Sequence, residues 1–161
     1  MKKTMRKLLL QLLKDSKRSD RELAKVLDVS QATVSRMRNK LVRDGVIKEF
    51  TVIPDFTKMG FELLAIISCK SESSKEIAEK ARKWTMSKPN VIFAGRAEGM
   101  GKNAVIVSIH KNFTDYSNFL TQLRFEGKGI VEDYETLIVS LNGFIAKPLS
   151  LKYLAELCEK W

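Results

Sequence analysis

The chain has 161 residues, of which 44% are hydrophobic and 30% are charged. These proportions are typical of a folded globular protein and exclude an intrinsically disordered chain. The length corresponds to one ordinary domain or two small ones. Lysine and arginine number 29 against 19 aspartate and glutamate residues, a net charge of +10, which favours a polyanionic partner such as nucleic acid or an anionic membrane surface.

The first segment superficially imitates a secretory signal, because basic residues precede a leucine-rich run. That run is interrupted by Gln11 and followed directly by Lys14 and Asp15, with no cleavage site. No stretch approaches the roughly 18 apolar residues of a membrane span. Cys69 and Cys158 are isolated and lack metal-binding spacing. We therefore expect a cytoplasmic protein with no membrane partner and with reduced cysteines.

The positive charge is concentrated in the first third of the chain. Residues 1–53 contain 14 basic and 6 acidic side chains, whereas residues 54–161 contain 15 and 13. This asymmetry predicts a basic binding domain over 1–53 and a nearly neutral domain over 54–161, with Pro54 at the boundary.

Three helices are predicted in the basic domain. Leucines spaced at i, i+1, i+4 and i+5 give Lys3–Asp15 an apolar face. Ser19 and Glu22 have the spacing of a capping box, which begins a second helix. Ser30 caps a third helix after a short turn. Two helices joined so tightly are typical of a helix-turn-helix.

The third helix, Gln31–Asp44, is predicted to contact double-stranded DNA. Val34 and Leu41 share its apolar side, and the opposite side carries cationic, amide and hydroxyl groups. Such groups pair with base edges and phosphates in the major groove. A merely solvated surface would also display charges, but this one has no acid before Asp44. The predicted contact residues are Ser30, Gln31, Thr33, Ser35, Arg36, Arg38, Asn39, Lys40 and Arg43.

Gly45 ends this helix, and the β-rich segment Val46–Ile53 predicts a short strand or wing. The pattern resembles the leucine-responsive regulatory protein (Lrp/AsnC) family of prokaryotic transcription regulators. The residues that carry this resemblance are Arg18-Ser19, Leu23-Ala24, Val29-Ser30, Thr33-Val34, Arg36, Leu41, Gly45-Val46-Ile47 and Met59-Gly60.

The resemblance implies an N-terminal winged helix-turn-helix, a linker strand, and a C-terminal ferredoxin-like domain that dimerises and often senses a small effector such as an amino acid. The chain departs from the family at one point. After the position of Arg36 the family usually has Arg and then an apolar residue, where this chain has Met37-Arg38. Arg38 is therefore expected either at the domain edge or on a phosphate.

The remaining chain is predicted to complete an α+β fold. Strand and helix patterns alternate in the ferredoxin-like order βαββαβ, and both helices would cover one face of a four-stranded sheet. A C-terminal helix follows Pro148, to pack on its own sheet edge or on a neighbouring subunit. The segments in chain order are Glu62–Lys70, Ser74–Met86, Val91–Ala97, Lys102–His110, Thr114–Glu126 and Ile130–Leu141.

Neither face of the predicted sheet is clearly polar, because apolar residues occupy both parities of its first and last strands. One layer of helices leaves the second face in water. A second subunit packed face to face would cover it, so we expect a homodimer or a higher assembly such as a tetramer or octamer. A dimer would also offer two recognition helices to a pseudo-palindromic operator.

The hairpin Gly99, Met100, Gly101, Lys102 is the candidate effector site. It lies between two central strands, where the family commonly binds effectors around a Gly followed closely by an Asp. That Asp is missing here, and a glycine-rich turn without a ligand is the alternative interpretation. The spacing does not match a phosphate-binding loop.

Enzymatic chemistry has little support in the sequence. His110 is the single histidine, and its place at a strand end suits an exposed or a hydrogen-bonded imidazole better than a catalytic or metal-binding one. We expect no catalytic residue, cofactor or metal. The prediction is a sequence-specific transcription regulator. The alternatives are an enzyme of tetrapyrrole (sirohaem) decarboxylation, as some proteins resembling this family are, and an architectural DNA-binding protein.

Overall fold

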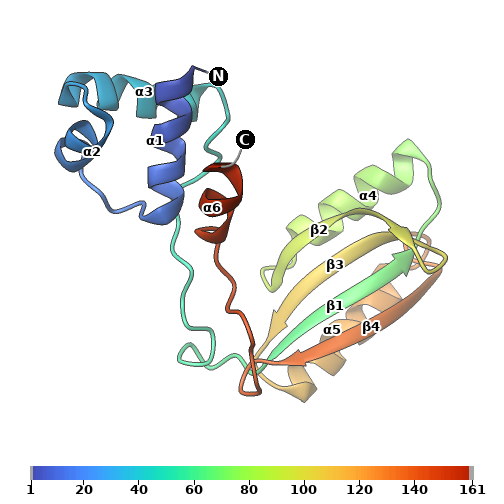
Figure 1. The fold of residues 1–161 in the computed structure, drawn as a ribbon. Helices are drawn as coiled ribbons and strands as arrows, with labels where there is room; N and C mark the ends of the chain where they lie inside the picture. The colour runs from blue at the N-terminus through green and yellow to red at the C-terminus, as the bar shows by residue number, and fades with distance from the viewer. Residues whose placement is uncertain (1, 160–161) are drawn as a thin grey trace. The chain divides into compact units, whose positions relative to one another are not determined.

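The computed structural model describes residues 2–159 and divides into two compact units (Figure 1). One unit comprises residues 2–53 together with 147–159, and the other is Pro54–Ala146. The two units meet in sequence at Ile53 and Pro54. The sequence placed 54–161 in one domain, whereas the structure groups residues 147–159 with the basic N-terminal segment.

Three helices form the core of the first unit: α1 (Lys3–Lys14), α2 (Asp20–Leu27) and α3 (Gln31–Arg43). Each contributes one apolar stripe, and the stripes meet in a cluster of buried side chains. The shortest helix, α2, has too few residues to be stable alone, so packing against its neighbours holds it in place. The buried residues of the cluster are Met5, Leu8, Leu12, Leu23, Ala24, Val34 and Leu41.

The C-terminal helix α6 (Tyr153–Glu159) packs against α1 within the first unit. Ala155 is fully buried, and its small side chain permits close approach. The Arg6 guanidinium donates a hydrogen bond of 2.6 Å to the backbone oxygen of Cys158. The docking site that the sequence left open is therefore α1, and not the edge of the sheet.

Residues 44–62 connect α3 to the first strand of the second unit, and in the structure they contain turns but no strand. The strand predicted over Val46–Ile53 is therefore wrong. A strand needs a neighbour to satisfy its backbone groups, and no described segment pairs with this one. Its β-forming side chains stay in solvent, with Phe50 50% and Val52 73% exposed.

The second unit is a four-stranded antiparallel sheet covered by two helices, which confirms the predicted ferredoxin-like order. The strands lie side by side in the order β2-β3-β1-β4. The elements are β1 (Leu63–Lys70), α4 (Lys75–Met86), β2 (Val91–Gly99), β3 (Lys102–His110), α5 (Phe113–Glu126) and β4 (Asp133–Ser140).

The core of this unit lies between the sheet and its helices. Ile67 and Ile106 pair across β1 and β3 and pack with Phe119 and Leu123 of α5. His110 is also fully buried, and its Nε2 lies 2.8 Å from the Ser108 hydroxyl. Of the two environments that the sequence left open, the structure therefore shows the buried, hydrogen-bonded imidazole and not the exposed one.

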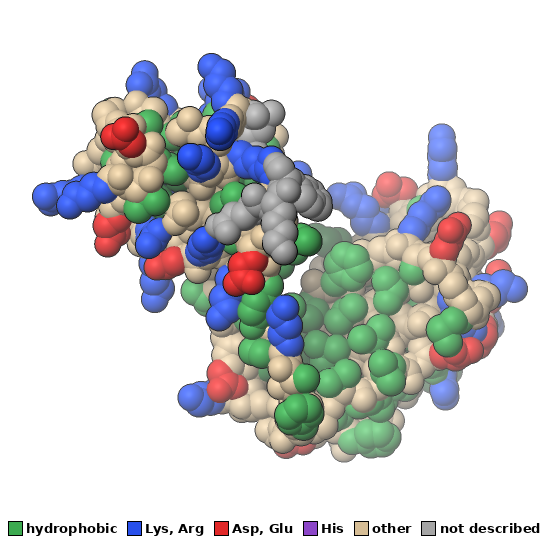
Figure 2. All heavy atoms as spheres, viewed as in Figure 1, with side chains coloured by type: hydrophobic (Ala, Val, Ile, Leu, Met, Phe, Trp, Pro, Cys, Tyr) green, Lys and Arg blue, Asp and Glu red, His purple; other side chains and the backbone are tan. Residues whose placement is uncertain are grey.

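The other face of the sheet is apolar and uncovered. Figure 2 shows hydrophobic side chains gathered on this face. Ile66 pairs with Val107 on one side and with Leu137 on the other, and Leu64 pairs with Val139. Leu137 is 63% exposed. An apolar patch of this kind marks an interaction surface.

Candidate DNA-binding site

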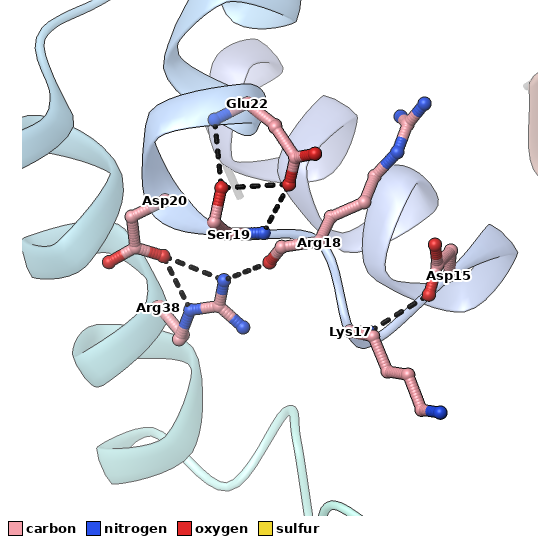
Figure 3. Close-up of polar contacts among 7 residues, drawn as sticks. All are labelled: Asp15, Lys17, Arg18, Ser19, Asp20, Glu22 and Arg38. Atoms are coloured by element: carbon pink, nitrogen blue, oxygen red, sulfur yellow. Dashed lines mark hydrogen bonds and ion pairs between the residues drawn. The ribbon is translucent and has the colours of Figure 1, made fainter.

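The second helix of the site begins with a complete capping box (Figure 3). The backbone N–H of Glu22 donates to the Ser19 hydroxyl at 3.2 Å, and the Ser19 N–H donates to the Glu22 carboxylate at 2.7 Å. The Ser19 hydroxyl also donates to the Glu22 carboxylate at 2.7 Å, and this bond, followed by the one from the Ser19 N–H, holds the pKa of Glu22 below its ordinary value. The motif satisfies two otherwise unpaired donors and fixes the start of α2.

A tight turn then sets α3 against α2. Asp28 ends α2 in the left-handed conformation, with φ of 53°, which a short polar side chain tolerates better than most. Two residues later Ser30 caps α3, where its hydroxyl accepts a hydrogen bond from the Thr33 N–H at 3.2 Å. The predicted helix-turn-helix geometry is thus produced by two caps and one left-handed residue.

The outer side of α3 is the candidate DNA-binding surface, consisting of Arg36, Asn39, Lys40 and Arg43. All four side chains are exposed, whereas Val34 and Leu41 on the opposite side of the helix are fully buried. Because the buried side is anchored in the core, the outer side is presented on a rigid element. Its guanidinium, amide and ammonium groups suit guanine, adenine and phosphate respectively.

The ends of this surface are organised by short-range contacts. Near the start of α3, the Arg36 guanidinium donates to the Thr33 hydroxyl at 3.3 Å, and that hydroxyl lies 2.8 Å from the Ser30 hydroxyl. At the other end, Lys40 forms an ion pair of 2.7 Å with Asp44. The hydrogen bond from Lys40 is the main reason that the pKa of Asp44 lies below its ordinary value.

The other predicted contact residues differ in accessibility. Ser30 and Gln31 are exposed at the start of α3, next to the turn. Thr33 and Ser35 are half-buried, so they present less of their hydroxyl groups to a ligand than the four residues of the outer surface. All of the predicted contact residues therefore lie on α3 or at its N-cap, but their side chains are exposed to different extents.

Arg38 departs from the predicted DNA contacts. Its Nε and Nη2 donate to one carboxylate oxygen of Asp20 at 2.9 and 2.6 Å, and Nη2 also reaches the backbone oxygen of Arg18 at 3.3 Å (Figure 3). The guanidinium lies 5.8 Å from the centre of the Phe50 ring. Arg38 thus ties α3 to the start of α2. Helical rotation puts it nearer to Val34 than to Arg36, a signal that was available in the sequence.

Two basic residues of α2 were missed by the sequence reasoning. Arg21 and Lys25 are exposed, and with Gln31 they line a shallow notch between α2 and α3. In a helix-turn-helix the first helix crosses the DNA backbone, so these cations are positioned for phosphates. Their wide angular separation from the apolar stripe of α2 was the signal that could have identified them.

The candidate effector hairpin turns through three consecutive residues with left-handed backbone angles. Gly99, Met100 and Gly101 all have positive φ values, and the Met100 side chain is 84% exposed. The Lys102 ammonium is buried in ion pairs with Asp133 and Glu135, and the hydrogen bond to Asp133 raises the pKa of Lys102. Lys102, which the sequence placed in the candidate effector hairpin, is therefore paired with acidic groups of its own chain.

Comparison with known proteins identifies the family. The family described as winged helix-turn-helix DNA-binding matches residues 1–48. The HTH-type transcriptional regulator FL11 of Pyrococcus furiosus is 32% identical over 132 residues, covering 80% of this chain and 82% of that protein. The chain belongs to the Lrp/AsnC family of HTH-type transcriptional regulators.

A higher identity is confined to a shorter segment. The uncharacterized HTH-type transcriptional regulator PF1734 of Pyrococcus furiosus is 44% identical over 70 residues, which are 44% of this chain. The matched segment spans 47% of that relative, so the chain corresponds to about half of its length.

Solved structures of other proteins share the fold. PH0061 of Pyrococcus horikoshii superposes with a TM-score of 0.79 at 24% identity, covering 93% of this chain and 97% of that one. An AsnC family regulator from Agrobacterium tumefaciens gives 0.76 at 23% identity, with 96% and 99% covered. The regulator NMB0573 of Neisseria meningitidis, solved as an L-Met complex, gives 0.75 at 18% identity, with 96% and 99% covered.

The family membership argues against the enzymatic alternative, since Lrp/AsnC relatives are named as regulators and not as enzymes. Within residues 2–159, no cluster of three or more His, Cys, Asp or Glu side chains is arranged to hold a metal ion. In the same residues, no helix has the length and apolar character that a membrane span requires.

Proposed function

We propose that this Lrp/AsnC protein is a sequence-specific DNA-binding transcription regulator of the cytoplasm. The observation that carries the proposal is the outer side of α3, where Arg36, Asn39, Lys40 and Arg43 are exposed on a helix whose opposite side is fixed in the core. A rigid, cationic and hydrogen-bonding ridge suits the major groove of duplex DNA.

Affinity and specificity come from different residues in this proposal. Exposed cations such as Arg21, Lys25 and Arg43 bind phosphates, which supplies affinity for any sequence. Arg36 and Asn39 lie near the middle of the outer surface and read base edges, guanine and adenine respectively. The net charge of +10 adds long-range attraction to DNA.

We propose further that the functional form is a homodimer, or a tetramer or octamer built from dimers. The uncovered apolar sheet face around Ile66, Val107 and Leu137 supports it, because a second copy packed face to face would remove that patch from water. Two copies also supply two α3 helices, as a pseudo-palindromic operator requires.

A DNA titration tests the first proposal. Binding to a duplex from the protein's own upstream region should weaken by about a thousandfold between 50 and 200 mM salt if 6 to 10 phosphates are neutralised. Arg36→Ala should reduce discrimination between operator and random DNA by about 1–3 kcal/mol. Arg21→Ala should weaken both duplexes equally, and Lys111→Ala, an exposed lysine of the second unit, should change neither.

Two results would count against sequence-specific regulation. Equal affinity of the unmodified protein for operator and random duplexes would favour an architectural role instead. A flat salt response would remove the contribution of the exposed cations.

The dimer is tested separately by sedimentation. Leu137→Lys places a charge in the uncovered face without disturbing a buried contact, and should convert the protein to a monomer. Phe125→Lys is the matched control, since Phe125 is 78% exposed on α5, on the helix-covered side of the unit. A stable monomer of the unmodified chain at micromolar concentration would contradict the proposal.

A small effector such as an amino acid is the remaining part of the proposal. Its support is the L-Met complex of the Neisseria regulator and the exposed backbone of Gly99, Met100 and Gly101 in this chain. Millimolar L-Met or L-Leu should raise the melting temperature and alter DNA affinity. Absence of both effects across the natural amino acids would remove this part and leave DNA binding intact.

A further inference from the structure

The second unit contains a cavity of about 960 Å³ between α4 and the edge strand β2. This volume is at the upper end of the range of small-molecule sites, about 300–1,000 Å³. Its floor is formed by the buried core side chains Cys69, Ile106 and Leu123. The walls are largely apolar, with Ala78 and Ala81 from α4 and Ala94 from β2.

The cavity exists because α4 meets the sheet with small side chains. Ala94 and Arg96 pair with Ile106 and Ala104, which belong to the helix-covered face, so both β2 residues point under α4. No residue of α4 is fully buried. Alanines on both sides leave a gap where larger side chains would close the layers, and an apolar gap of this size stays open for a ligand.

Contacts at the end of α4 hold the helix above the gap. Trp84 Nε1 donates to the Glu126 carboxylate at 3.0 Å, and the Lys88 ammonium following α4 bonds the same carboxylate at 2.6 Å. The Trp84 ring lies 5.7 Å from the Phe119 ring, centre to centre. At its other end α4 is capped by the Ser74 hydroxyl. The C-terminal end of the helix is thus tied to α5, and residues from its middle line the cavity.

Two arginines, one from α4 and one from β2, line the cavity. Arg82 comes from the middle of α4 and Arg96 from β2, and both are exposed. Neither guanidinium group has a hydrogen-bond or ion-pair partner within residues 2–159. The acids Glu72 and Glu98 also line the cavity. Glu72 follows the C-terminal end of β1 and Glu98 lies near the C-terminal end of β2, and the antiparallel pairing of both strands with β3 places these two ends at the same end of the sheet.

From this arrangement we propose that the cavity binds an aliphatic carboxylate, with its hydrocarbon chain on the apolar floor and its carboxylate on Arg82 and Arg96. A guanidinium pairs with a carboxylate through parallel hydrogen bonds, which favours this head group over a hydroxyl or an ammonium. The site requires neither DNA nor a second subunit, so it is independent of the function proposed above.

Intrinsic fluorescence provides a direct measurement. The chain has two tryptophans, and Trp84 lines the cavity, so Trp161→Phe leaves a single reporter in the site. Octanoate should change the emission saturably with one site per chain. Hexanoate should bind roughly 15-fold more weakly, because each methylene contributes about fourfold. Octylamine, with the same tail and a positive charge, should bind at least about tenfold more weakly than octanoate.

Variants assign the binding to the cavity. Arg82→Gln and Arg96→Gln should each weaken octanoate binding about tenfold, the usual loss of a hydrogen bond to a charged group. Ala78→Phe fills the cavity and should abolish binding, and an unchanged melting temperature would show that the unit stays folded. Lys83→Gln is the matched control, since Lys83 is exposed on the same helix but does not line the cavity.

Several outcomes would overturn the proposal. They are a non-saturable emission change, equal binding of octanoate and octylamine, or octanoate binding that survives both the arginine variants and Ala78→Phe.

Discussion

Arg36 and Arg38 should respond differently to substitution by alanine. The two arginines are two positions apart on α3, yet one is exposed and the other is tied to Asp20. The side chains of Arg38 and Asp20 are only 20% and 23% exposed. Arg38→Ala should therefore act on stability, whereas Arg36→Ala should act on DNA binding.

The expected size of the Arg38→Ala effect follows from the contacts that it removes. Three hydrogen bonds are lost, and two of them reach the same carboxylate oxygen of Asp20. Because these two bonds share one acceptor, we count them as one bond to a charged group, which contributes about 1.5–3 kcal/mol. The ring contact with Phe50 adds about 0.5 kcal/mol. We expect a loss of about 2–3 kcal/mol, which lowers the melting temperature of a unit this small by roughly 10 °C or more.

Circular dichroism melting measures this loss, and hydrogen exchange of α2 and α3 assigns it to the first unit. A double-mutant cycle with Asp20→Ala should give a coupling energy of about 1–2 kcal/mol, since the two residues touch. Arg36→Ala should change stability by less than about 0.5 kcal/mol. The structural role of Arg38 would be refuted if Arg38→Ala had the melting temperature of the unmodified protein and lost DNA affinity to the same extent as Arg36→Ala.

Three further predictions concern folding. Leu41→Ala should cost about 2–5 kcal/mol in chemical denaturation, since Leu41 is fully buried, and a loss below 1 kcal/mol would contradict the packing of α3. Ser19→Ala should cost about 1 kcal/mol by removing the capping box, and Ser16→Ala, outside it, is the control. Burial keeps the pKa of His110 below 6.5, although Asp115 opposes this. As the pH falls below 6.5, the unfolded chain therefore takes up the proton first and stability decreases. NMR titration of this single histidine should give a midpoint below 6.5, and a midpoint at or above 6.5 would exclude the effect.

Much of the architecture could be predicted because its signals are local. The Ser19 and Glu22 capping box, the Ser30 cap and the apolar spacing of Val34 and Leu41 each act within one or two helical turns. Residues so near to one another in sequence interact whatever conformation the rest of the chain adopts. The same holds for the extended segments predicted at Glu62–Lys70 and Lys102–His110, which the structure confirms as β1 and β3 to within one residue.

The sequence by itself therefore determined the order of the elements, the two-sided character of the helix proposed to contact DNA and the apolar character of both sheet faces. Tertiary structure decided the rest, because each remaining feature depends on a partner distant in sequence. Asp20 captures Arg38, the carboxylates of β4 capture Lys102, and α1 receives the C-terminal helix. A strand at 46–53 does not form, since β-propensity without a neighbouring strand leaves backbone groups unpaired.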